Sequence, residues 1–399
     1  MERASSAKTV RVFAVASFLN DFGSDIIYPI WPLFVTTTLG ANTAILGLID
    51  GLGEAVVSVS QAASGYLSDR IQRRKIFIWL GYAFGSLSRI GYALSSVWQQ
   101  VLPFRVFDRM GKIRGAPRDA IIADVSGDEN RGKNFGLLRS MDNLGAVCGI
   151  LFCLAFIDIG YQNLFLIASV PSAVAVVLIL SYVRDPERSA TKAFKGLSLR
   201  RFNKNLTLTF VSGALFALGA FSYSFLLLYA GDLGLSASLM PVLYLVFTVV
   251  AALLSFPFGR LADLVGRKPI LLAGYACWGF TCLGFLTLGG ILGAILCFIS
   301  YGVHKAAMEP VQKALVSELS PEGLRASTLG SFQMVIGLCA FPSSFVAGLL
   351  WSTVDKLAPL QVSILLTIAS GVVLLFVREN DRRIEEQSTK VAGSYEPRT

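Results

Sequence analysis

Charged side chains are scarce in this 399-residue sequence: Asp, Glu, Lys and Arg make up 15% of it, against about 25% in an ordinary soluble domain. Hydrophobic residues make up 54%, so the composition disfavours a soluble fold. A helix that crosses the hydrocarbon core of a bilayer needs about 20 mainly apolar residues. Twelve such helices would use about 240 residues and leave enough chain for the loops and both tails. The sequence therefore predicts an all-α membrane protein.

Residues for metal binding and nucleophilic catalysis are also scarce. The single histidine, His304, argues against a histidine-rich metal site and against a nucleophilic triad. The six cysteines lie inside apolar runs without the spacing of metal ligands, which indicates small core residues. The chain has no phosphate-binding loop of the Walker type. We therefore expect no metal, no cofactor and no enzymatic activity.

Apolar segments follow one another along the chain, and each is long enough to cross a bilayer once. We expect twelve spans, at about 11–35, 43–66, 76–95, 97–121, 135–157, 162–183, 205–230, 238–259, 270–289, 291–313, 327–351 and 357–377.

Basic residues are concentrated in alternate connections between these spans. The linker at 184–204 alone holds seven of them, whereas the connections on the opposite side hold Lys356 only. By the positive-inside rule the basic set is cytoplasmic, and so are both termini. This distribution explains the net charge of +9 without a nucleic-acid partner.

The chain repeats itself with an offset of 194 residues. Gly65, Asp69 and Arg73 recur as Gly259, Asp263 and Arg267, and the same offset places Asp124 on Glu318. A constant register across separate regions indicates duplication. We expect two pseudo-symmetric six-helix bundles at 1–183 and 205–377, joined by the cytoplasmic linker at 184–204 and followed by a tail at 378–399.

The repeated segment resembles the loop signature of the major facilitator superfamily of secondary transporters, G-x-L-x-D-R-x-G-R-R/K. The first copy departs from it at Gln72, where the family has glycine, and the second at Leu264, where the family has arginine. The fourth span, Arg105 to Ala120, is similar to a bacterial, exporter-like subgroup. The resemblance implies a monomer in the bacterial inner membrane that carries a small molecule by alternating access.

The duplicated loop also has a physical interpretation. Glycine permits two helices to approach closely, and an aspartate beside a helix N-terminus or an arginine can hold one conformation and release it in another. The alternative is a plain cluster of topogenic charges. The residues of this proposed latch are Gly65, Asp69, Arg70, Arg73, Arg74, Asp263 and Arg267.

Ionisable residues inside the spans are costly and normally face a partner or a wet cavity. Asp21 and Asp25 lie four residues apart on the first span, and Glu54 lies on the second. We expect at least one of Asp21 and Asp25 to carry a proton, with Glu54 as the alternate. Arg105 and Arg109 of the fourth span should lie opposite Asp21 and Asp25 and favour their ionised form, with Arg109 as the switching partner.

A second set of candidates is expected to bind substrate or to switch with it. The alternative for each ionised member is a buried structural ion pair, and for the others a packing role. These residues are Arg105, Asp108, Arg109, Lys112, Tyr223, His304, Lys305 and Glu309.

The fifth span resembles a signature of proton antiporters at Gly145 to Ile150, with Ile150 in place of proline, and its glycines suit close helix packing. Proton-coupled export by antiport is the leading interpretation. Uptake of an organic anion is the alternative, since the basic residues of the spans could form an anion site. A membrane sensor or enzyme on the same scaffold is more remote.

Overall fold

The computed structural model describes residues 2–71, 73–126, 131–184, 203–320 and 325–378. Within these ranges the side chains of 2–6, 69, 123, 131–133 and 325–327 are not described. Most of the linker at 184–204, nearly all of the tail at 378–399 and the side chain of Asp69 therefore lie outside the described residues.

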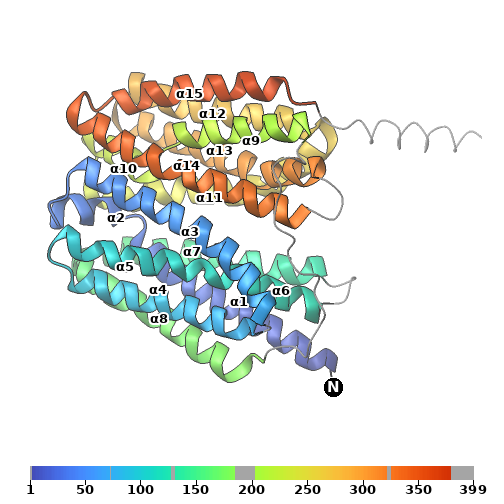
Figure 1. The fold of residues 1–399 in the computed structure, drawn as a ribbon. Coiled ribbons are helices and arrows are strands. Elements are labelled where there is room, and N and C mark those ends of the chain that lie inside the picture. The colour runs from blue at the N-terminus through green and yellow to red at the C-terminus, as the bar shows by residue number, and fades with distance from the viewer. Residues whose placement is uncertain (1, 72, 127–130, 185–202, 321–324, 379–399) are drawn as a thin grey trace, which may run out of the picture.

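The helices of the first half of the chain form one group, which we call the first group (Figure 1). They are α1 (Glu2–Ile27), α2 (Trp31–Leu33), the π-helical turn η1 (Phe34–Thr38), α3 (Thr43–Ile71), α4 (Arg74–Leu94), α5 (Trp98–Met110), the 3-10 turn η2 (Gly111–Arg114), α6 (Gly115–Val125), α7 (Arg131–Phe156), η3 (Ile157–Ile159) and α8 (Tyr161–Tyr182).

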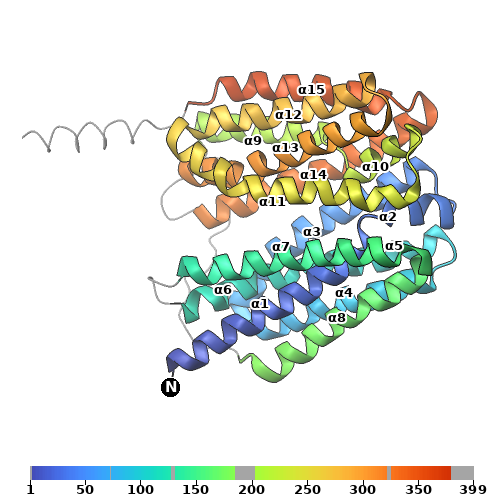
Figure 2. The ribbon, with the colours of Figure 1, turned by 180° about the vertical axis from the view of Figure 1, so that it is seen from behind.

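The helices of the second half form the second group, which lies above the first in Figure 1 and again when the molecule is turned round in Figure 2. They are α9 (Lys204–Gly219), α10 (Tyr223–Asp232), η5 (Ala237–Leu239), α11 (Met240–Val265), α12 (Arg267–Thr287), α13 (Gly290–Leu319), α14 (Arg325–Thr353) and α15 (Ala358–Leu375).

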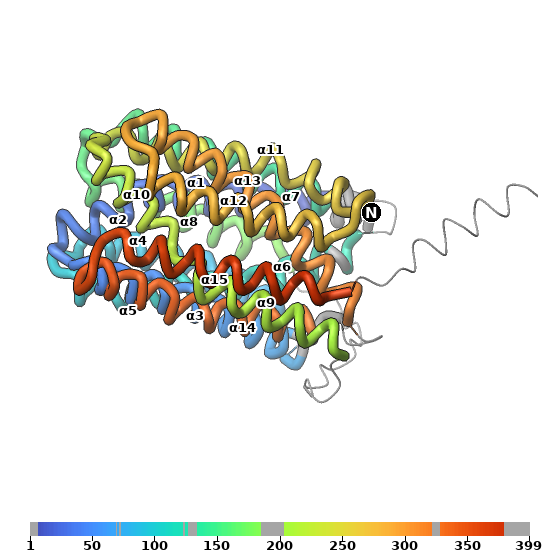
Figure 3. Tube along the Cα trace, turned by 90° about the horizontal axis from the view of Figure 1, so that it is seen from above, coloured from blue at the N-terminus to red at the C-terminus, as the bar shows by residue number. Residues whose placement is uncertain are grey.

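All the long helices run roughly along one axis, so the molecule has two ends (Figures 1 and 3). The N-terminus and the last turn of α15 lie at the same end, which we call the near end. The connection between α2 and α3 lies at the opposite, far end.

Nine helical stretches within the described residues are long and apolar enough to cross a membrane. The segments α1, α4 and α5–α6 run beside them (Figure 3) but are more polar, since they hold residues such as Asp21, Arg89 and Arg105. The most polar helices therefore belong to the first group.

Glycines set the closest helix contacts. A Cβ atom at Gly145 or Gly149 of α7 would lie 2.4 or 2.3 Å from a carbonyl oxygen of α1, so α1 and α7 touch through their backbones, as the spacing of these glycines predicts. Between the groups, a Cβ at Gly348 of α14 would lie 2.2 Å from the carbonyl oxygen of Thr43. A similar seam of small residues therefore joins α3 to α14.

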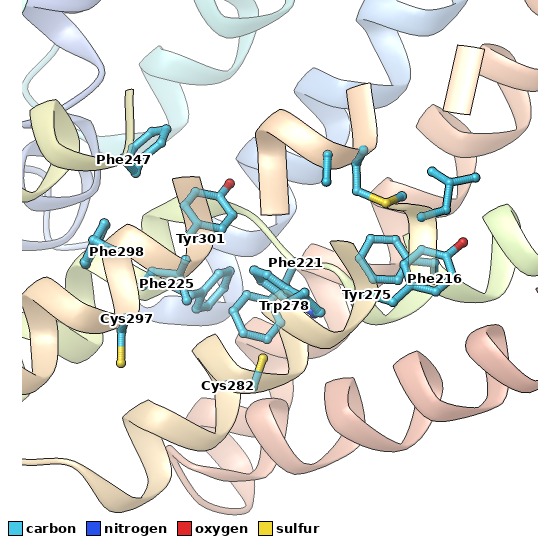
Figure 4. Close-up of a cluster of buried hydrophobic side chains, with 14 of the residues drawn as sticks. Phe216, Phe221, Phe225, Phe247, Tyr275, Trp278, Cys282, Cys297, Phe298 and Tyr301 are labelled. Carbon is cyan, nitrogen blue, oxygen red and sulfur yellow. The ribbon is translucent and has the colours of Figure 1, made fainter. Parts of the chain in front are cut away.

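Aromatic side chains fill the second group (Figure 4). The rings of Phe216 and Tyr275 stack with centroids 4.4 Å apart, and those of Phe221 and Trp278 meet edge to face at 5.4 Å. Three of the six free cysteines are buried, and Cys282 lies beside these rings. The aromatic residues of the seventh predicted span are therefore mainly core.

Candidate functional site

A cavity of about 390 Å³ lies between the two groups. We call it the central cavity. Its wall on the first group includes Asp50, Glu54 and Arg109, and its wall on the second group includes Tyr223 and Lys305. Charged residues of the first half and of the second half therefore face one space, although they lie more than 150 residues apart in the sequence.

A larger cavity, of about 860 Å³, continues from the central one toward the near end. The two share Glu309, Lys313 and Gln333 in their walls. At the far end the groups touch instead, because the Thr43 hydroxyl donates to the carbonyl oxygen of Gly348 at 3.3 Å. The cleft between the groups is thus continuous toward the near end and closed at the far end.

Asp50 connects the groups at the inner end of this cleft. Its side chain is 3% exposed. One carboxylate oxygen accepts hydrogen bonds from Arg105 at 2.7 Å and from the Trp31 indole at 2.9 Å. The other accepts from the hydroxyls of Ser222 at 2.7 Å and Ser224 at 2.5 Å. Residues of four helical segments thus meet at one carboxylate.

Two arginines of α5 belong to the wall of the central cavity. The Arg105 guanidinium is 4.2 Å from the centre of the Trp31 ring, and that of Arg109 is 5.2 Å from the centre of the Tyr28 ring. A Cβ at Gly53 would lie 3.3 and 3.4 Å from their Nε atoms, so only a small residue fits there. Arg105 is 2% exposed and pairs with Asp50, whereas Arg109 is 8% exposed.

Asp108 lies between these arginines, 4.0 Å from Arg105 and 3.8 Å from Arg109. It is not part of the wall of either cavity, and it compensates charge inside the first group. Lys112, in contrast, lines the near-end cavity. The charged residues of the fourth predicted span therefore have two environments. Asp108 lies between the two arginines inside the first group, and Lys112 faces the cleft.

The charged residues in the second group's wall of the central cavity all come from α13. Lys305 is exposed in the cavity, and its ammonium lies 5.6 Å from the centre of the Tyr301 ring. Glu309 accepts a hydrogen bond from Lys313 at 3.2 Å. His304 is 4% exposed and its Nδ1 pairs with the carbonyl oxygen of Gly274 at 2.9 Å. Lys305 is therefore the α13 cation best placed to meet a ligand.

Tyr223 contributes to the cavity wall and to the closure between the groups. Its hydroxyl donates to the carbonyl oxygen of Tyr28 at 3.2 Å, and its ring meets that of Tyr244 edge to face at 5.3 Å. A position in the cavity wall and a contact between the groups coincide at this residue.

The expected pairing of Asp21 and Asp25 with Arg105 and Arg109 is wrong. Asp21 lies 3.9 Å from Arg114 and lines the near-end cavity. Asp25 is 8% exposed and has Tyr244 as its hydrogen-bonding neighbour. Because Arg114 follows Arg109 by five residues, Asp21 meets the fourth predicted span more than one helical turn away from its expected partner.

Arg89 of α4 is a structural residue. Its guanidinium, 1% exposed, donates to the carbonyl oxygens of Ala168 and Asn20 and to the hydroxyls of Ser172 and Ser24, at 2.6 to 3.1 Å. It ties α4 to α1 and α8.

The two copies of the repeated loop form similar ion pairs at the near end. Arg74, at the start of α4, pairs with Asp124 at the end of α6. Arg267, at the start of α12, contacts Glu318 at 2.5 Å and Asp263 at 3.4 Å. Each group thus joins two of its own helix ends by an arginine and a carboxylate.

The repeat differs by one residue from the expected register, because Arg74 and not Arg73 is the counterpart of Arg267. The second copy turns from α11 to α12 through Gly266 alone, which has a φ of +99°. Glycine adopts this conformation without strain. The first copy has Gln72 in the place of that glycine, and two residues separate the end of α3 at Ile71 from the start of α4 at Arg74.

The expected close approach at Gly65 is also wrong. A Cβ atom there would lie 3.5 Å from the Cβ of Ala116, an ordinary contact, and none of the described neighbours comes within 4 Å of a Cβ at Gly259. Arg70 and Arg73 are exposed. The glycines of the loop are therefore not what brings these helices together.

Sequence reasoning missed the role of Asp50 and did not single out Ser222 or Ser224. Asp50 was visible as an intramembrane carboxylate four residues before Glu54. The serines gave no signal, since the break between α9 and α10 contains no proline and reads as continuous apolar sequence.

Comparison with known proteins settles the family. A family model described as Major Facilitator Superfamily matches residues 13–240 and 209–395. The chain belongs to the Major Facilitator Superfamily. An uncharacterised transporter of this superfamily from Methanocaldococcus jannaschii is 36% identical over 381 residues, which cover 93% of this chain and 95% of that protein.

More distant matches agree with this assignment. A solved structure of a variant of the nucleoside transporter NupG aligns with a TM-score of 0.78 at 13% identity and covers 93% of this chain and 100% of its own. The quinolone resistance protein NorA of Staphylococcus aureus is 24% identical over 212 residues, 53% of this chain and 54% of NorA. The chain is therefore an integral membrane protein and a transporter rather than an enzyme.

Proposed function

We propose that this transporter moves a small organic molecule with an anionic group by alternating access, coupled to protons. Twelve membrane spans in two six-helix bundles would rock about the central cavity. The observation that carries the proposal is the cleft between the groups, lined by charge, continuous to one end and closed at the other.

The charges of the central cavity support an anionic ligand. Of the seven charged side chains in its wall, Asp50 pairs with Arg105 and Glu309 with Lys313. The other three are Glu54, Arg109 and Lys305. Their positive excess, contributed from both groups, suits a carboxylate or phosphate.

Glu54 is the best-placed coupling group in this cavity. It interacts electrostatically with both Arg109 and Lys305. An anion that binds these two cations takes over their interaction with Glu54 and adds a like charge, so Glu54 takes up a proton. Proton and anion then bind together, which couples uptake of the anion to an inward proton gradient.

Export by proton antiport, the leading expectation from the sequence, is the second candidate. The partial match to NorA, a resistance protein by name, favours it. Asp21 in the near-end cavity supplies a carboxylate at which a proton and a cationic substrate could compete. Asp25 is the other carboxylate of that proposal.

One measurement separates these candidates. The protein is reconstituted into liposomes that hold a pH-sensitive dye, and organic anions and organic cations are added outside in turn. Cotransport with protons acidifies the lumen, whereas exchange for protons makes it alkaline; protein-free liposomes report passive entry of weak acids. No change with any compound, in either direction, contradicts proton coupling.

Substitutions of three carboxylates in the same assay identify the residue that carries the proton. Glu54→Gln should abolish the proton signal and keep substrate exchange, because the amide does not titrate. Asp21→Asn and Asp25→Asn should leave the signal of anion uptake intact. The opposite pattern would favour the antiport candidate and make Glu54 structural.

The orientation also remains a proposal. The basic linker and both termini should lie in the cytoplasm of a bacterial cell, which makes the near end cytoplasmic and the cleft inward-facing. An impermeant thiol reagent should label Ser189→Cys only after the cells are broken. Labelling of intact cells would reverse the topology.

A further inference from the structure

We propose that Asp50 couples the two groups of helices and closes the far end. Its carboxylate is held in the first group by Arg105 and Trp31 and accepts hydrogen bonds from Ser222 and Ser224 of the second group. This inference rests on the alternating-access function proposed above, because it assigns the contact that the conformational change must break.

One side of the carboxylate is fixed. Arg105 and Trp31 belong to the same group as Asp50, and the Arg105 guanidinium also lies on the Trp31 ring. Both Asp50 and Arg105 are almost fully buried. A rigid movement of the first group carries all three residues together, so the ion pair persists in both conformations.

The other side of the carboxylate is the part that separates. Ser222 precedes α10 as its N-cap, and its Oγ accepts a hydrogen bond from the Ser224 amide at 3.3 Å. The start of α10 therefore faces Asp50, and a helix N-terminus favours a carboxylate. Both hydroxyl contacts cross between the groups.

The break between α9 and α10 also joins this contact to the seam between α3 and α14. The Ser222 amide donates to the Ser344 hydroxyl of α14 at 3.1 Å. A Cβ at Gly47, three residues before Asp50, would lie 2.1 Å from the Ser344 carbonyl oxygen. The hydrogen bonds and the seam therefore form one continuous contact, and opening of the far end disrupts both.

The strength of the contact gives a measurable expectation. Hydrogen bonds to a charged acceptor are stronger than those between neutral groups. Only the closed arrangement contains the hydrogen bonds from Ser222 and Ser224 to Asp50, so removal of these two hydroxyls should favour the open arrangement. We expect the ratio of open to closed molecules to rise tenfold or more when both hydroxyls are removed.

The test uses the double variant Ser222→Ala/Ser224→Ala, because it leaves the pair of Asp50 and Arg105 intact and so preserves folding. Spin labels at Ser96→Cys in the first group and Ala237→Cys in the second, both exposed at the far end, report their separation in a background without the six native cysteines. The double variant should gain a long-distance population at least tenfold over the wild type.

Two further variants make the outcome decisive. Ser212→Ala removes a buried α9 hydroxyl that bonds only within the second group, to Ser370 and Tyr275, and should leave the distances unchanged. Gly337→Ala crowds the α3–α14 seam and should open the far end independently of Asp50.

If Gly337→Ala opens the far end and the serine variant does not, the role of Asp50 is wrong while alternating access stands. If one distance persists in the wild type and in every variant, alternating access itself is contradicted. An equal shift in Ser212→Ala would show that any loss of an α9 hydroxyl suffices and would also overturn the inference.

Discussion

Replacing Gly337 with alanine should force α3 and α14 apart and disfavour the closed far end. The new Cβ would lie 1.6 Å from the Ser58 hydroxyl oxygen, 2.4 Å from the Ser58 Cβ and 3.1 Å from the carbonyl oxygen of Glu54. The hydroxyl can rotate away, but the Ser58 Cβ cannot move without its helix. A normal carbon–carbon contact of about 3.5 Å therefore requires α3 to retreat by about 1 Å.

The cost of this displacement follows from the packing of protein interiors. Overpacking by a methyl group costs about 1–3 kcal/mol, and the strain falls on a contact between the groups. This strain is absent from a conformation in which α3 and α14 are separated. The ratio of open to closed molecules should therefore rise by about 5- to 150-fold.

The assay is the distance between spin labels at Ser96→Cys and Ala237→Cys, with thermal unfolding measured in parallel. Gly330→Ala on the same helix is the matched control, because its Cβ would have none of the described atoms within 4 Å. Ser58→Gly should restore the wild-type ratio in Gly337→Ala, at a cost of about 1 kcal/mol in stability from a glycine inside a helix. If Gly337→Ala and Gly330→Ala behave alike, the steric reasoning is refuted.

Three further predictions concern stability within a group and are checked by thermal or chemical unfolding in detergent. Arg89→Ala should cost about 3 kcal/mol or more, because it leaves several buried acceptors without their donor; a loss below about 1 kcal/mol would contradict this. Gly149→Ala, whose Cβ would lie 2.3 Å from a backbone oxygen of α1, should cost about 1–3 kcal/mol and leave the ratio of open to closed molecules unchanged, whereas Gly136→Ala should be neutral. Lys313→Ala breaks a solvent-accessible ion pair with Glu309 and should cost less than about 1 kcal/mol.

The sequence was sufficient for the parts of the fold that depend on local patterns. Apolar runs located the helical segments, and the spacing of Gly145 and Gly149 predicted the close packing of α7 on α1. Each of these inferences uses residues on one helix, where geometry follows directly from the spacing along the chain.

Contacts between helices could not be read in the same way, because they depend on depth and rotation. Asp21 lies beside Arg114 rather than the expected Arg109, more than one turn away along the fourth predicted span. The pairing of Asp50 with Ser222 joins residues 172 positions apart at a helix break that no proline marks. The first copy has Gln72 where the second has Gly266, and the arginine that begins the next helix is Arg74 rather than Arg73. The missing glycine is visible in the sequence, but only the structure shows in which direction the register shifts.

The distribution of charge between the groups bears on how the far end can open. The ion pairs between described side chains all lie inside one group, including Asp50 with Arg105 and Arg267 with Glu318. Breaking a buried ion pair by separating its members costs about 3–5 kcal/mol, enough to trap one conformation. Across the closed far end, Asp50 meets neutral hydroxyls instead, and water can replace these as the cleft opens. Separation of the groups then leaves Arg105 with its partner, so the two conformations can lie close in free energy, which is the condition for a ligand to shift the population between them.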